Sequence, residues 1–314
     1  MDDGYRSRPA TGEDRAAIAE VFTVEGIDDH GRLTFPAEDL VEYIWGSFGF
    51  DPALDGLTIE SPAGSVVAFA SLYPTKDPAE PADGTLTVHP EHRRRGIGPE
   101  LVGWLEARAV ATGARALRIE TPTANTGRST MLSRLGYEHV RTFWTMQRDL
   151  APGEPLPVPP PGIHIRTFRP GDETAAHAAI TEAFRGHFGH TEETLEEWVE
   201  SHVRLPGFDP MQFFLAVEGD EVVALLYQIT RGEVAYVASL GTREGWRGRG
   251  IAKALLRHSF ADLARRGLKE VTLSVDSSNA TGATRLYESV GMKVDHGWNT
   301  YDRQLEHAAE ASNR

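Results

Sequence analysis

The alternation of apolar and polar positions predicts one order of elements that occurs twice along the chain. Each half opens with a short strand pattern, at Tyr5–Arg8 and at Ile163–Phe168, followed by a turn and a helix that has acidic residues near its start. A second helix is expected at Ala37–Ser47 and at Thr194–Val203, the latter with a Thr-x-x-Glu capping box. The two halves therefore begin alike.

Strand patterns and crossing helices then alternate in both halves. A hairpin signal at Gly219-Asp220 joins two strands of the second half. The expected strands are Leu57–Glu60, Val66–Tyr73, Thr85–Val88 and Leu117–Thr121, then Gln212–Glu218, Glu221–Ile229, Val234–Leu240 and Glu270–Val275, with helices at Pro99–Ala111 and Lys253–Arg266. Helices that cross between strands predict a mixed α/β sheet, of the α+β kind, in each half.

A proline-rich stretch separates the halves. Residues 151–162 contain six prolines, which neither donate to a strand ladder nor continue a helix, so a semi-rigid linker is expected there. The expected domains are 1–150 and 163–305, with a polar, disordered tail at 306–314.

Composition excludes several kinds of chemistry. The chain has no cysteine, which rules out disulfides, thiolate nucleophiles and cysteine-ligated metals. A formal net charge of −14 argues against nucleic acid as a partner and suits a cationic amine, although solubility explains it equally well. No apolar run reaches the roughly 18 residues of a membrane span, and the acidic start is no signal peptide, so a cytoplasmic location is expected.

The most informative motif also occurs twice. Arg93-Arg94-Arg95-Gly96-Ile97-Gly98 returns as Arg247-Gly248-Arg249-Gly250-Ile251-Ala252, each copy between a strand pattern and a helix pattern. Glycines permit a tight turn and a close approach to a ligand, and free N–H groups at a helix start attract phosphate oxygens. Two copies in register predict two phosphate-binding turns.

With this turn and the element order together, each half resembles a GCN5-related N-acetyltransferase (GNAT) domain. The resemblance implies that acetyl-CoA lies in a gap between two central strands, its pyrophosphate held by backbone N–H groups of the turn. The residues implied for CoA binding in the second half are Leu240, Gly241, Thr242, Arg247, Gly248, Arg249, Gly250, Ile251, Ala252, Lys253 and Asn279. Those in the first half are Leu86, Thr87, Val88, Arg93, Arg94, Arg95, Gly96, Ile97 and Gly98.

The halves diverge downstream of the turn. Residues 279–292 match the family's Asn…Leu-Tyr-x-x-x-Gly signature, and the resemblance implies that Tyr287 protonates the departing thiolate. A thiol of pKa ~8.5 needs that proton near neutral pH, and a phenol of pKa ~10 can supply it; the alternative is a tyrosine that only packs its ring. Four residues before its glycine, the first half has Leu132, and Pro99 removes one N–H from its turn. That half is expected to be catalytically degenerate: a support, a non-catalytic CoA site or a wall of the substrate site.

The general base is not evident from the sequence. Many relatives place a carboxylate 14 residues before the first glycine of the turn, but that position holds Tyr236 in the second half and Ala82 in the first. Glu233 lies three residues earlier, where strand alternation turns it to the opposite face unless a bulge intervenes. Glu233, Tyr236 and a water chain remain candidates, beside plain structural roles for both residues.

Two histidines, His187 and His190, follow the first helix of the second half, where relatives often line the acceptor site. No standard zinc spacing accompanies them, so no metal is expected. Plain surface histidines are the simplest interpretation.

These observations together predict an acetyl-CoA-dependent N-acetyltransferase whose working site lies in 163–305. The acceptor is a primary amine of a small molecule, with no nucleic acid or membrane partner, and the protein is a monomer or homodimer. Direct transfer is favoured because no cysteine is present to carry the acetyl group. The tandem arrangement also resembles mycothiol synthases, which acetylate a cysteinyl-glucosamine-inositol amine. A non-catalytic acyl-CoA sensor or scaffold is the alternative of a different class.

Overall fold

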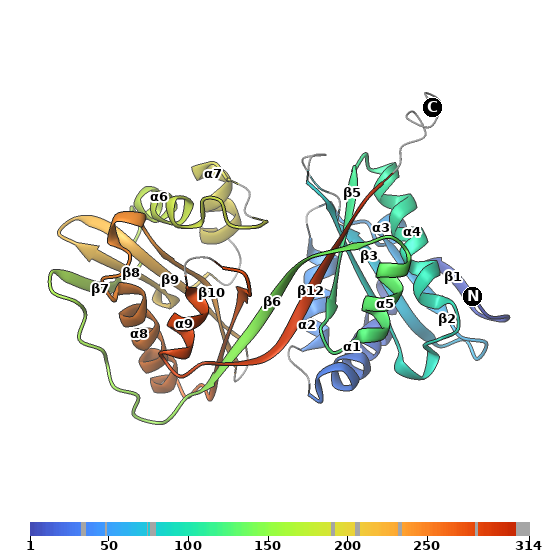
Figure 1. Cartoon of the computed structure of the whole chain (residues 1–314), viewed down its shortest axis with the longest axis horizontal. Helices are drawn as coiled ribbons and strands as arrows, with labels where there is room; N and C mark the ends of the chain where they lie inside the picture. The colour runs from blue at the N-terminus through green and yellow to red at the C-terminus, as the bar shows by residue number, and fades with distance from the viewer. Residues whose placement is uncertain are drawn as a thin grey trace. The chain divides into compact units, whose positions relative to one another are not determined.

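The computed structural model describes residues 1–32, 36–47, 49–73, 75, 80–189, 192–204, 208–231, 234–279 and 282–305. The chain forms two compact units, which are drawn in Figure 1. The first unit contains residues 1–142 together with the chain from His296 onward, and the second contains residues 143–295. The expected tail at 306–314 lies outside the described residues.

The first unit is built on a six-stranded mixed sheet in the order β1-β2-β3-β4-β5-β12. Its strands and helices are β1 (Arg6–Pro9), α1 (Arg15–His30), α2 (Ala37–Gly46), α3 (Pro52–Asp55), β2 (Gly56–Glu60), β3 (Val66–Tyr73), β4 (Ala82–Val88), α4 (Ile97–Ala111), β5 (Ala116–Pro122), α5 (Thr126–Arg134) and the end of β12 (Lys293–Gln304).

The second unit has a sheet in the order β6-β11-β10-β9-β8-β7. Its elements are the end of β6 (Glu138–Asp149), then β7 (Ile163–Thr167), α6 (Glu173–Phe184), α7 (Leu195–Trp198), β8 (Phe213–Glu218), β9 (Glu221–Arg231), β10 (Val234–Thr242), α8 (Ile251–Arg265), β11 (Glu270–Asp276) and α9 (Ala283–Glu288). The helix expected over Thr194–Val203 is interrupted, because α7 passes into a π-helical turn at Val199–Val203.

The last strand of each half completes the sheet of the other unit. The Phe143–Asp149 part of β6 pairs antiparallel with β11, and the Trp298–Gln304 part of β12 pairs antiparallel with β5. The expected bounds at 150 and 163 follow chain order, whereas the compact units change at 142 and 295. Either half can supply an antiparallel partner of the same pattern, so local sequence does not reveal this exchange.

Helices cover both faces of each sheet, as alternation along the strands requires. On β8, Phe213 and Leu215 pack with α6 and α7, while Phe214 and Ala216 pack with α8. In the first unit, Phe69 of β3 packs with α1 and α2, and its neighbours on the strand pack with α4. The expectation of two mixed α/β domains in tandem is confirmed.

The central parallel strands separate after a short pairing in both units. Pairing of β4 with β5 ends at Gly84 opposite Ile119, although β4 continues to Val88. Pairing of β10 with β11 ends at Val237 opposite Leu273, although β10 continues to Thr242. Each unit therefore has a gap in its sheet beside the strand that leads to the arginine-glycine turn.

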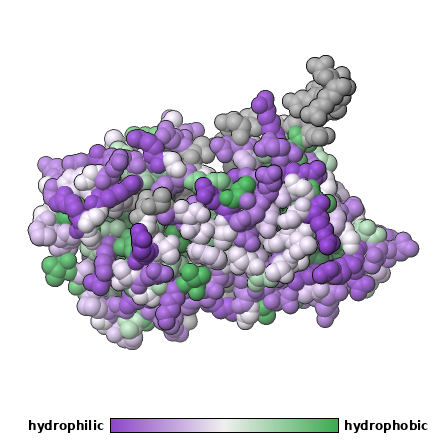
Figure 2. All heavy atoms as spheres, in the orientation of Figure 1, coloured by the Kyte–Doolittle hydropathy of each residue, from purple (hydrophilic) through white to green (hydrophobic). Residues whose placement is uncertain are grey.

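The face of the molecule drawn in Figure 2 is mostly hydrophilic, with small apolar groups scattered across it. Among the described residues, no helix is both long and apolar enough to cross a bilayer.

Candidate functional site

Both arginine-glycine turns use left-handed backbone conformations to enter their helices. Gly96 and Gly250 have φ of 78° and 80° and directly precede α4 and α8. Gly248 has φ of 76°, and at the equivalent place Arg94 adopts φ of 63°. The helices begin two residues earlier than expected. The N–H groups of a first helical turn have no acceptor within the helix, so both turns offer donors to an anion.

The arginines of the second turn mainly hold the turn in place. Arg247 donates to the backbone oxygens of Thr242 and Ala183, at 3.2 and 3.1 Å. Arg249 pairs with Glu218 at 3.0 Å, and its guanidinium lies 4.4 Å from the centre of the Trp246 ring. These contacts leave the backbone N–H groups as the principal anion donors of this turn.

A cavity of about 330 Å³ connects this turn to Tyr287 in the second unit. The described lining includes nine of the residues predicted for CoA binding: Leu240, Gly241, Thr242, Arg247, Gly248, Gly250, Ile251, Ala252 and Lys253. Arg249 and Asn279, predicted with them, are not among the lining residues. The Oγ1 atom of Thr242 is buried and has no hydrogen-bond partner among the described residues, which suits a cavity that awaits a polar ligand.

Tyr287 is held as a neutral phenol. The residue is only 8% exposed, on α9, and its burial raises its pKa to about 12, with a smaller contribution from nearby Tyr236. A phenol with this pKa stays protonated at neutral pH and can donate its proton into the cavity.

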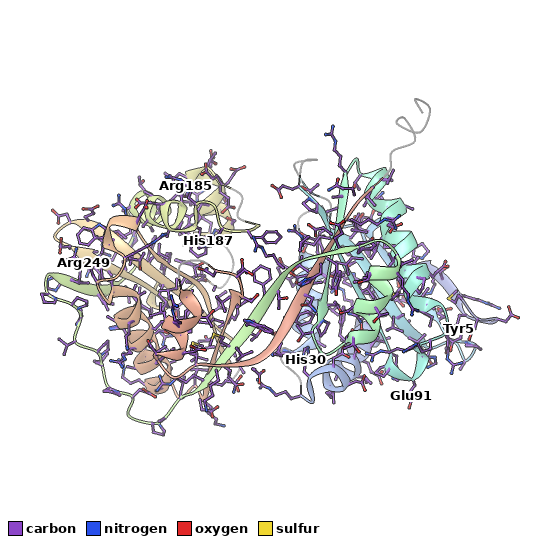
Figure 3. The ribbon with its side chains drawn as sticks, viewed as in Figure 1. Tyr5, His30, Glu91, Arg185, His187 and Arg249 are labelled. Carbon is purple, nitrogen blue, oxygen red and sulfur yellow. The ribbon has the colours of Figure 1, made fainter. Side chains whose placement is uncertain are left out.

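The candidates for the general base occupy three different places. Tyr236 lies on β10 and is 41% exposed, and Glu233 lies outside the described residues. His187, which the sequence favoured as a surface residue, lines the same cavity as Tyr287. Figure 3 labels it just after α6. Its place in the loop after the first helix was the only signal in the sequence.

The first unit has a carboxylate where the second has Tyr236. In the parallel pairing of the central strands, Asp83 lies opposite Arg118 and Tyr236 lies opposite Thr272. Arg118 and Thr272 are separated by the same 154 residues as Gly96 and Gly250, so Asp83 and Tyr236 are equivalent. A register shift between Val237 and Ser239 on β10 adds one residue. Counting back from the glycine alone therefore pointed to Ala82, one residue away from Asp83.

The turn of the first unit borders a larger cavity, of about 680 Å³. Of the residues predicted for CoA binding, Leu86, Val88, Arg93, Arg94, Gly96, Ile97 and Gly98 line it, and Thr87 and Arg95 do not. A Cβ at Gly98 would lie 2.6 Å from the sulfur of Met131, so the flexible end of that side chain would have to move to admit a larger residue. Leu132, which stands in place of Tyr287, is fully buried in the core.

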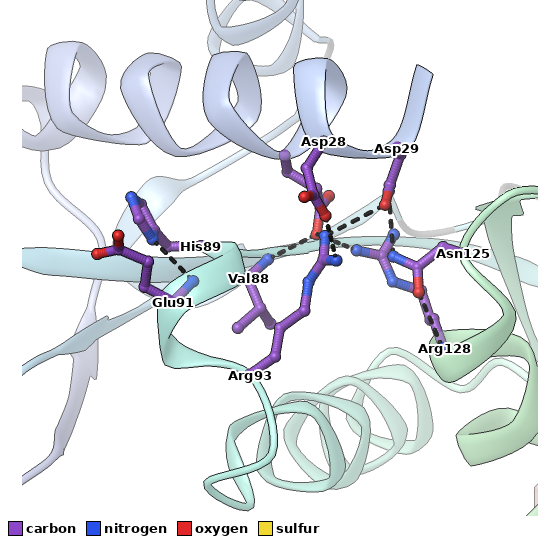
Figure 4. Close-up of polar contacts among 9 residues, drawn as sticks. Asp28, Asp29, Val88, His89, Glu91, Arg93, Asn125 and Arg128 are labelled. Carbon is purple, nitrogen blue, oxygen red and sulfur yellow. Dashed lines mark hydrogen bonds and ion pairs between the residues drawn. The ribbon is translucent and has the colours of Figure 1, made fainter. Parts of the chain in front are cut away.

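A polar cluster borders this cavity through Arg93 and Arg128, and Figure 4 shows its members. Glu25 of α1 accepts hydrogen bonds from the side chain of Arg128 on α5 and, at 3.0 Å, from the backbone N–H of Val88. Arg93 of the turn contacts Asp28 at 2.7 Å and Asp29 at 3.3 Å. Glu25 and Arg128 are 6% and 8% exposed, so this is a buried ion pair.

A second cavity of the first unit, of about 710 Å³, shares Leu86 and Arg128 with the first. Asp83 of β4 and Glu120 of β5 face it. Although solvent in the cavity reaches both carboxylates, the surrounding protein raises the pKa of each by desolvation. Arg118 limits the increase at both, and Thr300 also limits it at Glu120.

Comparison with known proteins agrees with this geometry. The model of the Acetyltransferase (GNAT) family matches residues 23–137 and 176–292. A mycothiol acetyltransferase of Thermobispora bispora is 34% identical over 223 residues, covering 68% of this chain and 74% of its own length. The enzyme of the same name from Streptomyces bingchenggensis is 33% identical, covering 81% of this chain and 80% of its own.

Solved structures show the same tandem architecture. A GCN5-related N-acetyltransferase from Sphaerobacter thermophilus superposes with a TM-score of 0.85 at 30% identity, and 98% of each chain is covered. A tandem GNAT protein from the clavulanic acid biosynthesis pathway has a TM-score of 0.75 at 16% identity, covering 97% of this chain and 99% of its own. The chain is therefore a GNAT-type acetyltransferase and belongs to that family through both of its halves.

Proposed function

We propose that the second unit transfers an acetyl group from acetyl-CoA to a primary amine of a small molecule. The observation that supports this most directly is the single cavity whose lining runs from the arginine-glycine turn to the buried Tyr287. One end of this cavity suits a phosphate group, and the other presents a proton donor.

The residues present fit acetyl-CoA. The backbone N–H groups of Gly248–Lys253 would hold its pyrophosphate, and Leu240–Thr242 on β10 would hold the acyl end near the unpartnered Thr242 hydroxyl. Bound acetyl-CoA supplies an activated thioester and a thiol leaving group. The protein's contribution is to orient that thioester and to exclude water from it.

Two side chains handle protons in this proposal. Tyr287 holds a proton on its Oη atom, which its raised pKa keeps in place, and gives it to the leaving sulfur. His187 lines the same cavity and would accept a proton from the acceptor's ammonium, which leaves the neutral amine to attack; Tyr236 and Glu233 are the other candidates. Direct transfer is favoured, because the chain contains no cysteine to carry the acetyl group.

The acceptor to test first follows from the relatives. The similar proteins of Thermobispora and Streptomyces are named mycothiol acetyltransferases, so cysteinyl-glucosaminyl-inositol is the first candidate for this chain. The position equivalent to the usual carboxylate is Tyr236 here, which favours a wider panel of primary amines as well.

The test is release of CoA from acetyl-CoA in the presence of each amine, measured by chromatography because the cysteinyl acceptor carries a thiol of its own. Turnover with at least one primary amine is expected, and mass spectrometry of that amine should show a gain of one acetyl group. Tight binding of acetyl-CoA with no turnover on any amine would instead favour a non-catalytic sensor.

A further inference from the structure

Glu25 of the first unit corresponds to Ala183 of the second. Each lies 11 residues after the aspartate that pairs with the first strand's arginine, Asp14 with Arg8 and Asp172 with Arg166. The arginines of the two turns contact these two residues and so support the same correspondence. Arg93 reaches the side chain of Glu25 at 3.5 Å, and Arg247 reaches the backbone oxygen of Ala183 at 3.1 Å.

Arg128 corresponds to Ala283 in the same way. The helices α5 and α9 end with the same hydrogen bonds, from Tyr137 N–H to the oxygen of Leu132 and from Met292 N–H to the oxygen of Tyr287. Arg128 and Ala283 each lie four residues before those acceptors. Both members of the buried ion pair are therefore alanines in the second unit.

This difference divides the cavity of the first unit. In the second unit, Ala183 and Ala283 line the one cavity that runs from the turn to Tyr287. In the first unit, the cavity at the turn is lined by Arg128 but not by Glu25, and Glu25 faces only the second cavity. The ion pair also engages the N–H of Val88, which corresponds to Thr242.

The compartment that remains at the turn is cationic. Four arginines line it, Arg93, Arg94, Arg128 and Arg134, and no acidic residue is among its described lining residues. Arg93 is neutralised by Asp28 and Asp29, while Arg94 and Arg134 face the compartment from the turn and from α5.

From this arrangement we propose that the first unit binds the phosphorylated nucleotide end of a CoA-type ligand and excludes its acyl arm. The Glu25–Arg128 pair stands where the second unit has open space between two alanines. The first unit is thus a site for a nucleotide carrying several phosphates, whereas the second unit takes the complete acyl-CoA. This inference rests on the proposed placement of acetyl-CoA in the second unit.

The test compares two probes, adenosine 3′,5′-bisphosphate and acetyl-CoA, by titration calorimetry on the full chain. The nucleotide should fill two sites per chain. Acetyl-CoA should fill one tight site and one weak site, and the weak site should have a Kd within threefold of a nucleotide Kd. Two equal sites that both bind acetyl-CoA at least tenfold more tightly than the nucleotide would overturn the proposal, as would a single site for both probes.

Two double variants test the role of the ion pair. Removal of one partner alone leaves a buried unpaired charge, so both are changed together. Glu25→Ala with Arg128→Ala should open the arm channel and convert the weak acetyl-CoA site into a second tight one. Glu25→Gln with Arg128→Gln, which removes both charges but keeps most of the filled volume, should leave that site weak. Tight acetyl-CoA binding at this site in the glutamine variant would show that the volume of the two side chains does not exclude the acyl arm.

The reciprocal variant transfers the pair to the second unit. Ala183→Glu with Ala283→Arg should weaken acetyl-CoA binding there to the level of the nucleotide, at least tenfold, while nucleotide binding persists. Circular dichroism and the retained nucleotide sites report folding. Because these readouts are binding ratios, they stand if no amine is ever acetylated, and a failure of the proposed function is therefore distinguishable from a failure of this inference.

Discussion

The backbone oxygens of Leu132 and Tyr287 accept the same helix-closing hydrogen bond in their two units, from Tyr137 at 3.0 Å and from Met292 at 3.1 Å. The two side chains therefore start from equivalent places at the ends of equivalent helices. Leu132 is fully buried in the core, and Tyr287 lines the cavity that leads to the turn. One substitution at this place separates a unit with a proton donor from a unit without one.

Replacement of Tyr287 by phenylalanine should lower kcat roughly 10²–10⁴-fold, because the leaving thiolate loses its proton donor. KM for acetyl-CoA should change little, since the ring that lines the cavity is kept. Steady-state CoA release, followed by chromatography, measures both. Tyr137→Phe is the matched control, because Tyr137 is also buried and its hydroxyl bonds to Glu106 at 3.0 Å within the first unit. Full turnover by the Tyr287 variant would remove it from the mechanism.

The pH profile carries a second prediction for Tyr287. Burial raises its pKa to about 12, so the proton donor is still present well above neutral pH. We expect no loss of kcat from this group below roughly pH 10, where a phenol of that pKa is only about 1% ionised. A fall of the rate near pH 9 that disappears in Tyr287→Phe would contradict the assignment.

Arg94 adopts a left-handed conformation that glycine adopts more readily. Its φ is 63°, and the equivalent Gly248 has φ of 76°. Arg94→Gly should therefore raise the free energy of unfolding by about 1 kcal/mol, and Gly248→Arg should lower it by a similar amount. Differential scanning calorimetry of both variants would show shifts of opposite sign. Equal destabilisation by both would rule out strain at Arg94.

Asp302 stabilises the first unit although it lies near the end of the chain. Its carboxylate receives two hydrogen bonds from Arg118 of β5, at 2.9 and 2.8 Å. Asp302→Asn should cost about 1–3 kcal/mol, because it weakens a two-point charged contact. Hydrogen exchange should speed up in β5 and β12 of the first unit. The control is Gln304→Ala, which removes an exposed side chain on the same strand.

Acid should destabilise both units through matching aspartates. Arg8 lowers the pKa of Asp14 by donated hydrogen bonds, and Arg166 does the same for Asp172. A lowered pKa means that the unfolded chain binds the proton more readily. The stabilisation is thus complete above the ordinary aspartate pKa of about 4 and is lost as pH falls through the folded value.

Asp14→Asn should accordingly cost about 1–3 kcal/mol at pH 7 and less at pH 3. Urea unfolding at the two pH values measures the difference, with the neighbouring exposed Glu13→Gln as the control. A cost that is the same at both pH values would place the effect in packing rather than in charge.

The sequence patterns predicted the two repeated sheets and the turns correctly, because local physical requirements produce those patterns. A glycine before a helix at Gly96 and Gly250, and the apolar alternation on strands such as Phe213–Glu218, are local requirements that the chain must satisfy wherever it folds. Counting four residues back from the glycine aligned Leu132 with Tyr287. The two residues are equivalent in the structure as well, because both helices end on the same hydrogen bond.

The features that the sequence did not predict depend on contacts between segments far apart in the chain. The exchange of β6 and β12 is invisible locally, since an antiparallel partner is defined by pairing geometry and not by which half provides it. The register shift on β10 moved the equivalent of Tyr236 from Ala82 to Asp83. Glu25 and Arg128 lie 103 residues apart in the chain, so the sequence around either residue does not reveal that they form a buried ion pair.

By itself, then, the sequence determined two GNAT-like halves and the position of the tyrosine proposed as proton donor, because those features lie in short, periodic patterns. Only the tertiary structure decided which cavity continues from the turn to that tyrosine. A cavity is the space left when distant side chains have packed, and here it depends on alanines at 183 and 283 where the first unit has a buried ion pair.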